Sequence, residues 1–207
     1  MNSLISKYFT NLTPQQCQQI DAIDALYRDW NEKINVISRK DIDNLYEHHV
    51  LHSMAIAKVI RFRPGTQILD FGTGGGFPGI PLAILFPECQ FRLIDGTGKK
   101  IRVAQEVCNA IGLENCQPTH LRGEDEKGLY DFVVSRAVMP LPDLVKIVQK
   151  NISKKQQNAL ANGILCLKGG DLQAEIQPFK KIVQTTEISS FFNEEWFQEK
   201  HVIYLPR

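Results

Sequence analysis

The spacing of apolar residues along the chain changes near residue 62. Between residues 13 and 34, apolar side chains recur at every third or fourth position, which predicts an amphipathic helix. Its start, Thr13-Pro14-Gln15-Gln16, fits a capping box. A second helix is expected over residues 41–60. We therefore expect residues 1–62 to form an N-terminal helical extension.

From residue 63 to residue 207, short apolar runs alternate with helix-like stretches. This alternation is typical of an α/β fold with a mostly parallel sheet, and we expect one compact domain with helices on both faces of seven strands. The expected strands are residues 67–69, 90–94, 116–120, 130–135, 164–167, 182–188 and 201–205. The expected helices are residues 80–86, 99–111, 141–152 and 171–179.

A glycine-rich stretch runs from Asp70 to Gly79, between the first expected strand and a short helix. Glycine permits positive φ and a close approach of the backbone to a ligand, which predicts a nucleotide-cofactor loop. Gly74, Gly76 and Gly79 fit the G-x-G-x-x-G of dinucleotide enzymes, whereas Asp70, Gly72, Gly74 and Gly76 fit the acidic-x-G-x-G-x-G loop of S-adenosylmethionine (SAM) methyltransferases. We favour SAM, because an acidic residue at position 70 suits its cationic methionine end, either directly or by holding the loop.

A carboxylate, Asp95, follows the second expected strand. In either register of the glycine loop, it is placed to accept both hydrogen bonds from a ribose diol. The alternative is that Asp95 caps the helix that begins near Gly98-Lys99-Lys100. We favour cofactor binding.

Composition and charge limit the partners. With 207 residues, 43% of them apolar, the chain is long enough for one full core and too short for two large domains. A net charge of +1 excludes a nucleic-acid grip spread over the whole surface, so any such contact uses a local patch. Five dispersed cysteines without a C-x-x-C pair suggest neither disulfides nor zinc. With no signal-peptide pattern and no long apolar run, we expect a cytoplasmic monomer without a membrane span or bound metal.

Five motifs occur in an order that is more specific than any one of them: Asn35 followed by His49-x-x-x-Ser53, the glycine-proline stretch from Leu69 to Ala83, Asp95-x-x-Gly98-Lys99-Lys100, Val134-Ser135-Arg136-Ala137, and Leu167-Lys168-Gly169. This order resembles the bacterial 16S ribosomal RNA guanine-N7 methyltransferase family, also called glucose-inhibited division protein B. The matching segments extend from the first expected helix to Gly170, which is nearly the whole chain.

The resemblance implies a class I SAM methyltransferase with a Rossmann-like fold, which methylates N7 of one guanosine in the 530 loop of 16S ribosomal RNA, in the free RNA or in the small ribosomal subunit. It also implies that Gly72 and Phe77 line the SAM site, that Gly123-Glu124 lies against the adenine, and that Arg136 lies beside the cofactor. Guanine N7 carries an unprotonated lone pair, so we expect alignment of the reactants and no catalytic acid or base.

Basic residues near the expected carboxyl edge of the sheet are candidates for RNA binding: Arg39, Lys99, Lys100 and Lys168. Scattered surface charge is the alternative for each of them. Arg136 ends an apolar strand at the cofactor edge, where its planar guanidinium suits a carboxylate or a phosphate. A cation repels a sulfonium, so we assign Arg136 to binding and not to catalysis.

The chain departs from the family pattern in two motifs. His48-His49-Val50-Leu51-His52-Ser53 stands where the family commonly has Arg-His-x-x-Asp-Ser, and Gly75 stands where it commonly has Pro. His48 and His52 lie one helical turn apart, but the Glu of the metalloprotease signature is missing at position 49. A polar helix face or a phosphate-contacting surface is therefore favoured over a metal site.

Other functions remain open at this level. A SAM methyltransferase acting on another RNA, a protein or a small molecule would share the same loop. A nicotinamide oxidoreductase of this fold usually needs a substrate domain or a Tyr-x-x-x-Lys pair, but Val50 and Val134 stand four residues after Tyr46 and Tyr130. A non-catalytic adaptor is disfavoured by the intact glycine loop.

Overall fold

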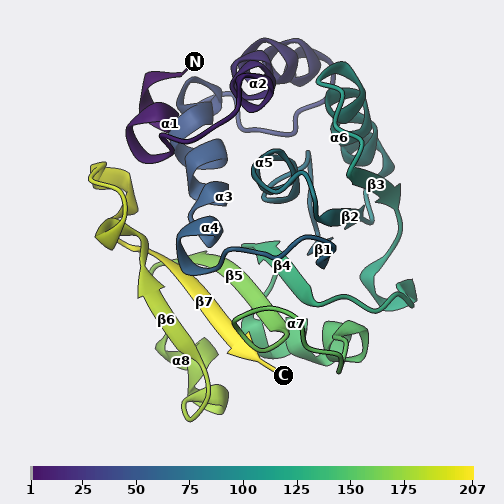
Figure 1. The fold of residues 1–207 in the computed structure, drawn as a ribbon, viewed down its shortest axis with the longest axis vertical. Coiled ribbons are helices and arrows are strands. Elements are labelled where there is room, and N and C mark those ends of the chain that lie inside the picture. The colour runs from purple at the N-terminus through teal and green to yellow at the C-terminus, as the bar shows by residue number, and fades with distance from the viewer. Residues whose placement is uncertain (1) are drawn as a thin grey trace.

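Seven strands form one sheet in the computed structural model, which describes residues 2–207 (Figure 1). Their order is β3-β2-β1-β4-β5-β7-β6, and all neighbours are parallel except the two pairs that involve β7. This confirms the predicted α/β fold with a mostly parallel sheet. The strands are β1 (Gln67–Phe71), β2 (Gln90–Asp95), β3 (Cys116–His120), β4 (Phe132–Arg136), β5 (Gly163–Gly169), β6 (Gln184–Glu187) and β7 (Lys200–Pro206).

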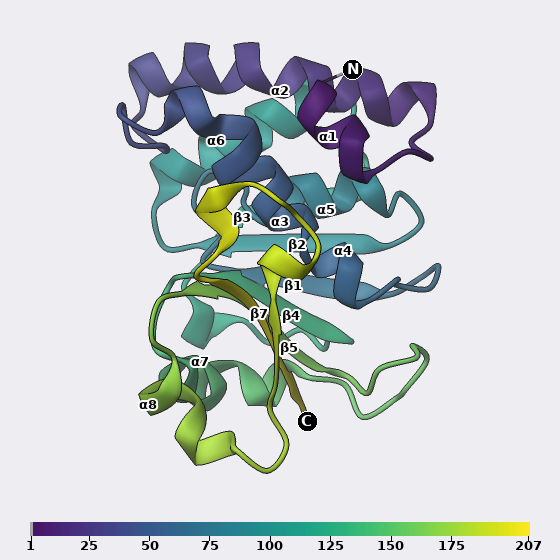
Figure 2. The same cartoon turned by 90° about the vertical axis from the view of Figure 1, so that its left-hand side faces the viewer.

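Helices cover both faces of the sheet, with α1 to α6 on one face and α7 and α8 on the other (Figures 1 and 2). None of the helices within residues 2–207 combines the length and the apolar character needed to cross a membrane. The α-helices are α1 (Ser3–Tyr8), α2 (Pro14–Lys33), α3 (His52–Met54), α4 (Ile56–Val59), α5 (Gly79–Leu85), α6 (Gly98–Ala110), α7 (Leu141–Val148) and α8 (Gln173–Ile176). Between α2 and α3 lie a 3₁₀ turn, η1 (Ile42–Asn44), and a π-helical segment, η2 (Leu45–Leu51).

Alternation along the strands divides the apolar side chains between two cores. In β1, Ile68 belongs to the core on the side of α1 to α6, whereas Leu69 and Phe71 belong to the core on the side of α7 and α8. Successive strand residues point to opposite faces, so Asp70 shares the face of Ile68 and points toward α5. A buried carboxylate therefore lies directly beneath the glycine-rich loop.

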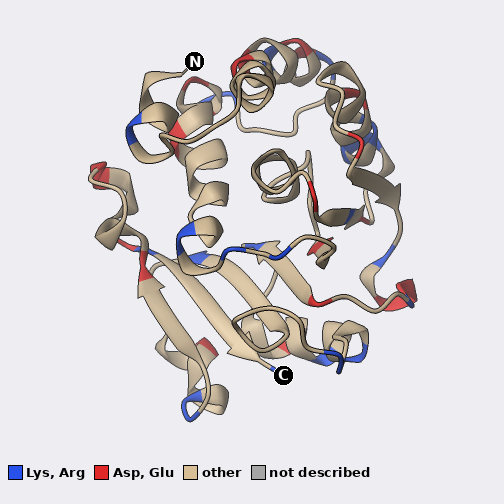
Figure 3. Ribbon diagram, in the orientation of Figure 1, with Lys and Arg blue, Asp and Glu red and all other residues tan. Residues whose placement is uncertain are grey.

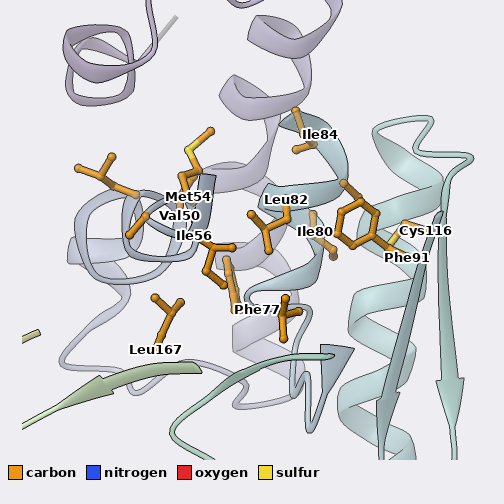
Figure 4. Packing of buried hydrophobic residues seen from close by; sticks show 14 of the residues in the cluster. Val50, Met54, Ile56, Phe77, Ile80, Leu82, Ile84, Phe91, Cys116 and Leu167 are labelled. Atoms are coloured by element: carbon orange, nitrogen blue, oxygen red, sulfur yellow. The ribbon is translucent and has the colours of Figure 1, made fainter. Parts of the chain in front are cut away.

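The N-terminal helices are part of the first core. Val50, Met54 and Ile56 pack in the same buried cluster as Phe77 and Leu82, which belong to the glycine loop and α5 (Figure 4). Buried contacts thus cross the expected boundary at residue 62. The division into an extension and a methyltransferase domain stays a prediction, and the two parts share one core.

Most expected elements are present with boundaries shifted by a few residues, and α2 begins with both bonds of the predicted capping box. The single helix expected over residues 41–60 is instead a succession of short segments, because the wider π-helical turn of η2 interrupts the α-helical repeat. The helix expected over residues 171–179 is α-helical only from Gln173 to Ile176 and continues as a 3₁₀ turn over Gln177–Phe179. Pro178 has no N–H with which to continue the α-helix. Helix α1 was not predicted.

Candidate functional site

The carboxyl ends of β1 and β4 lie side by side where the strand order reverses. From β1 the chain continues to β2 and β3 on one side, whereas β4 is followed by β5 on the other side. Ligands of open α/β sheets bind in the crevice outside such a reversal. The glycine-rich loop leaves β1 here and Arg136 ends β4 here, so this edge is the candidate site.

Asp70 holds the glycine-rich loop from within the protein. The residue is fully buried, and its Oδ2 accepts hydrogen bonds from Thr73 Oγ1 at 2.6 Å and from the Gly79 backbone N–H at 2.7 Å. Its Oδ1 has no hydrogen-bond partner within residues 2–207. Burial raises the pKa of Asp70 to about 7, although the two hydrogen bonds oppose this shift. Of its two expected roles, the geometry corresponds to holding the loop.

Three glycines of this loop, Gly72, Gly74 and Gly76, have positive φ values of 69°, 58° and 114°. A Cβ on Gly72 would lie 2.5 Å from Val138 Cγ2, and one on Gly76 would lie 2.4 Å from Ile80 Cδ1. A Cβ on Gly74 would have no atom within 4 Å. The positive φ strains any other residue at all three positions, and a Cβ would also crowd Val138 at Gly72 and Ile80 at Gly76. Gly74 instead presents bare backbone to open space, as a cofactor loop requires.

The helical extension contacts the loop directly. The buried hydroxyl of Tyr27 donates to the Gly75 carbonyl at 2.7 Å. A Cβ on Gly75 would lie 2.9 Å from Val36 Cβ, so Val36 fills the space that a larger residue at position 75 would need. Neither contact was predicted, because Tyr27 was recognised only as part of an apolar stripe and Val36 as part of a connector.

Asp95 connects the glycine loop to the segment before α6. Its Oδ2 accepts from the Gly74 backbone N–H at 3.0 Å, and its Oδ1 accepts from the Thr97 N–H at 2.7 Å. The N-cap of α6 is Thr97, so Asp95 does not occupy the capping position. A carboxylate has about four lone-pair directions, so this half-buried group retains acceptor capacity beyond these two bonds.

Two other predicted cofactor positions differ in exposure. Gly123 opens a 3₁₀ turn, η3 (Gly123–Asp125), and a Cβ there would lie 1.9 Å from the Phe71 ring, so the backbone of this turn packs closely against that ring. Glu124, next to it, is exposed. Phe77 is buried beneath the loop against Tyr27, with ring centroids 4.9 Å apart. Phe77 therefore supports the loop from below.

Arg136 ends β4 over the Phe77 ring, with the guanidinium carbon 5.1 Å from the ring centroid. Its Nη1 donates to the His48 carbonyl at 3.2 Å, and its Nη2 lies 3.0 Å from His49 Nδ1. His49 in turn lies 2.7 Å from Asp41 Oδ2 through its Nε2. Burial lowers the pKa of Arg136 to about 10, which leaves it charged at neutral pH. The sequence pointed to Arg136, but it marked Asp41 only as the start of a helix.

The histidines do not form the open polar face that the sequence suggested. His48 stacks on Trp196 with ring centroids 4.1 Å apart, and the buried His52 meets Trp196 edge-on at 5.0 Å. Within residues 2–207, no group of three His, Cys, Asp or Glu side chains is arranged to hold a metal ion. The side chain of His49 thus contacts Arg136 at the sheet edge, whereas the rings of His48 and His52 contact Trp196 in the C-terminal segment.

Lys and Arg are spread over many elements of the fold (Figure 3). The four basic substrate candidates fall into two groups. Arg39 and Lys99 are exposed and Lys100 is half-buried; Arg39 lies in the connector that packs on Gly75, and the lysines lie in the first turn of α6. Lys168 is buried instead, and its ammonium donates to the Met139 carbonyl and pairs with Glu175 at 2.8 Å. In this arrangement Lys168 fixes the loop after β4, and its role in substrate binding stays a prediction.

Comparison with known proteins gives a consistent match over almost the whole chain. The family model described as rRNA small subunit methyltransferase G matches residues 16–203. A protein named ribosomal RNA small subunit methyltransferase G from Bacteroides thetaiotaomicron is 64% identical over 201 residues, which cover 97% of this chain and 98% of the relative. A protein of the same name from Flavobacterium johnsoniae is 54% identical, over 98% of this chain and 96% of the relative.

Solved structures of other proteins share the fold. Precorrin-6y C5,15-methyltransferase from Geobacter metallireducens has a TM-score of 0.58 at 11% identity, over 84% of this chain and 92% of its own. Fibrillarin from Aeropyrum pernix, solved with natively bound S-adenosyl-L-methionine, has a TM-score of 0.55 at 13% identity, over 75% of this chain and 73% of its own. At such identities the likeness concerns the fold alone, which is that of class I SAM methyltransferases.

The buried carboxyl of Asp70 predicts a specific pH dependence of stability. Burial raises its pKa from 3.8 to about 7, so between these values the unfolded chain has lost a proton that the folded chain keeps. The contribution of this group to stability therefore falls as the pH rises from about 4 to about 7. Asp70→Asn removes this titration and keeps an oxygen acceptor for Thr73 and Gly79. From pH 5 to pH 8, the free energy of unfolding of Asp70→Asn minus that of the wild type should rise by about 2 kcal/mol in urea titrations.

The matched control is Asp143→Asn, since Asp143 is exposed on α7 and pairs with Lys146 at 3.0 Å. Its difference from the wild type should stay constant over the same pH range. Parallel stability curves for Asp70→Asn and the wild type would show that Asp70 is ionised throughout and would contradict the raised pKa of this buried carboxyl group.

Proposed function

Because the chain belongs to the rRNA small subunit methyltransferase G family, we propose that it transfers the methyl group of SAM to N7 of a guanosine in the 530 loop of 16S ribosomal RNA. The family resemblance of the sequence motifs is confirmed by this membership. One structural observation carries the proposal: the bare, positive-φ backbone of Gly74 lies 3.0 Å from the Asp95 carboxylate at the point where the strand order reverses.

The residues at this edge fit SAM. Gly74 leaves room for the ligand, Asp95 offers acceptors for the ribose hydroxyls at the end of β2, and the Gly123-Glu124 turn suits the adenine. Asp70 and Phe77 contribute from beneath, by fixing the loop that these groups share. When bound, SAM supplies an electrophilic methyl group on a sulfonium centre.

The protein's part in the reaction is alignment. Guanine N7 needs no base to expose its lone pair, and holding two reactants at near-attack distance contributes several orders of magnitude in rate. We therefore assign no residue as a catalytic acid or base. Arg136 serves binding, because it carries a fixed positive charge with N–H groups beyond the two bonded to the extension.

The RNA contact is assigned to a basic rim made of Arg39, Lys99 and Lys100. These residues come from the two segments that border the glycine loop, the connector after α2 and the start of α6. A local rim agrees with the net charge of +1, which provides no general attraction to a polyanion. The rim would bring phosphates to the same edge as the cofactor.

The experiment that tests this function is methylation of 16S ribosomal RNA with SAM labelled in its methyl group. Free 16S RNA and small ribosomal subunits are offered separately, and the modified nucleotide is mapped by mass spectrometry. We expect one 7-methylguanosine in the 530 loop with at least one of these substrates. Label at another atom or in another loop would contradict the site, and transfer to protein alone would contradict the function.

The basic rim predicts a directed salt dependence. Lys99→Ala combined with Lys100→Ala should weaken RNA binding and reduce the slope of log K against log salt concentration by about 1 to 2, since each lysine neutralises about one phosphate. Lys154→Ala combined with Lys155→Ala, in an exposed loop at the opposite edge of the sheet, is the matched control and should change little. Filter-binding titrations at several salt concentrations measure both. Equal losses from the two pairs would indicate diffuse charge instead of a rim.

A further inference from the structure

Arg136 is held by the helical extension, not by the sheet that carries it. Within residues 2–207 its two hydrogen-bond partners, the His48 carbonyl and His49 Nδ1, both belong to η2. An arginine only donates, so His49 Nδ1 must be the acceptor and the His49 proton must reside on Nε2. That Nε2 lies 2.7 Å from Asp41 Oδ2, so His49 donates to the carboxylate. The chain Arg136 to His49 to Asp41 therefore has one consistent set of proton positions.

Asp41 is hydrogen-bonded to both residues that bind Arg136, His48 and His49. Its second oxygen, Oδ1, lies 2.5 Å from Nδ1 of His48, the residue whose carbonyl accepts from Arg136. One carboxylate thus fixes two consecutive histidines within the π-helical turn. Burial alone would raise the pKa of Asp41, but hydrogen bonds from His48 and His49 lower it below its ordinary value. Burial and the charge of Arg136 lower the pKa of His49 to about 4, so His49 is neutral at physiological pH, as its role of acceptor requires.

We propose that Asp41 and His49 are positioning residues that hold the guanidinium of Arg136 in place to bind an oxyanion of the reactants. The guanidinium has five N–H groups and two are bonded within the protein, which leaves three for a ligand. An oxyanion is the ligand that matches a fixed cationic fork. This inference rests on the proposed function, because its two sources of oxyanion are the carboxylate of SAM and a phosphate of the RNA.

Asp41→Asn is the most informative single change. An asparagine can present its amide N–H₂ to His49 Nε2, which would move the imidazole proton to Nδ1 and turn a donor toward Arg136. The change is nearly isosteric and removes no apolar contact. The matched control is Asp43→Asn two residues along the chain, where the carboxylate is 81% exposed and pairs only with Arg28 in the described structure.

The test is a double-mutant cycle of the wild type, Asp41→Asn, Arg136→Ala and the double variant. Calorimetry gives the Kd for SAM, methylation kinetics give KM and kcat for 16S RNA, and thermal melting verifies that each variant is folded. We expect Asp41→Asn to raise one binding constant about tenfold with little change in kcat. A raised SAM Kd identifies the SAM carboxylate as the oxyanion, and a raised RNA KM identifies a phosphate. The double variant should bind no more weakly than Arg136→Ala alone.

The positioning role is overturned if the effects of Asp41→Asn and Arg136→Ala multiply, or if Asp41→Asn is indistinguishable from Asp43→Asn. If Arg136→Ala does not fold, Arg136→Lys replaces it, since it keeps the charge and loses the fork. A wild type that binds SAM and transfers no methyl group to ribosomal RNA overturns the proposed function. In that case, the Kd values for SAM still test whether Asp41 and His49 position Arg136.

A second pair of variants addresses His49 itself. His49→Asn places a carbonyl oxygen near the position of Nδ1 and keeps an acceptor for Arg136, whereas His49→Gln places an amide near Nε2 and loses that acceptor. We expect the affinity of His49→Asn to stay within about threefold of the wild type and that of His49→Gln to fall about tenfold. The reverse order would contradict the proton positions inferred here.

Discussion

The buried carboxylate of Asp70 is the interaction on which the candidate site depends. It lies near the carboxyl end of β1, beside the central strand β4, and one of its oxygens accepts hydrogen bonds from Thr73 and Gly79, near the two ends of the glycine-rich loop. Keeping a carboxyl group in this position has a free-energy cost, since burial raises its pKa to about 7. In return, the loop stays open at Gly74 although its glycines occupy conformations that other residues rarely adopt. The candidate site is thus preorganised by a buried residue that holds the loop from beneath.

The helical extension completes this site. It shares the apolar core of α5, its Tyr27 donates to the loop at Gly75, and η2 supplies the His48 carbonyl and His49 Nδ1 that bond Arg136. Two departures from the family pattern find a place in these contacts. Val36 packs where a proline at position 75 would need space, and His48 and His52 pack on Trp196 of the C-terminal segment. Residues 2–62 therefore line one side of the candidate site, in addition to covering one face of the sheet.

Local patterns were sufficient to predict the strands, the glycine-rich loop after β1 and the position of Asp95 at the end of β2, because strand alternation and turn residues are properties of neighbouring positions. Contacts between distant segments were not predictable in this way. Asp41 precedes Arg136 by 95 positions and looked like an ordinary helix start, and Lys168 looked like a free cation although Glu175 and the Met139 carbonyl bind it in a buried position. The interrupted helix of residues 41–60 also escaped prediction, since the apolar spacing of a π-helical turn resembles that of an α-helix. These contacts depend on the folded arrangement, which local sequence patterns do not specify.

The most direct test of this account is a crystal structure of the protein with S-adenosylhomocysteine, the demethylated product of SAM. We predict that the ligand lies across Gly72 and Gly74, with its ribose hydroxyls within hydrogen-bond distance of Asp95. Arg136 should face either the carboxylate of the ligand or the solvent beside it, where an RNA phosphate would bind. Asp70 should keep its bonds to Thr73 and Gly79 and make no contact with the ligand. A ligand bound elsewhere, or held directly by the Asp70 carboxylate, would contradict the central claim that a buried acidic residue shapes the site without entering it.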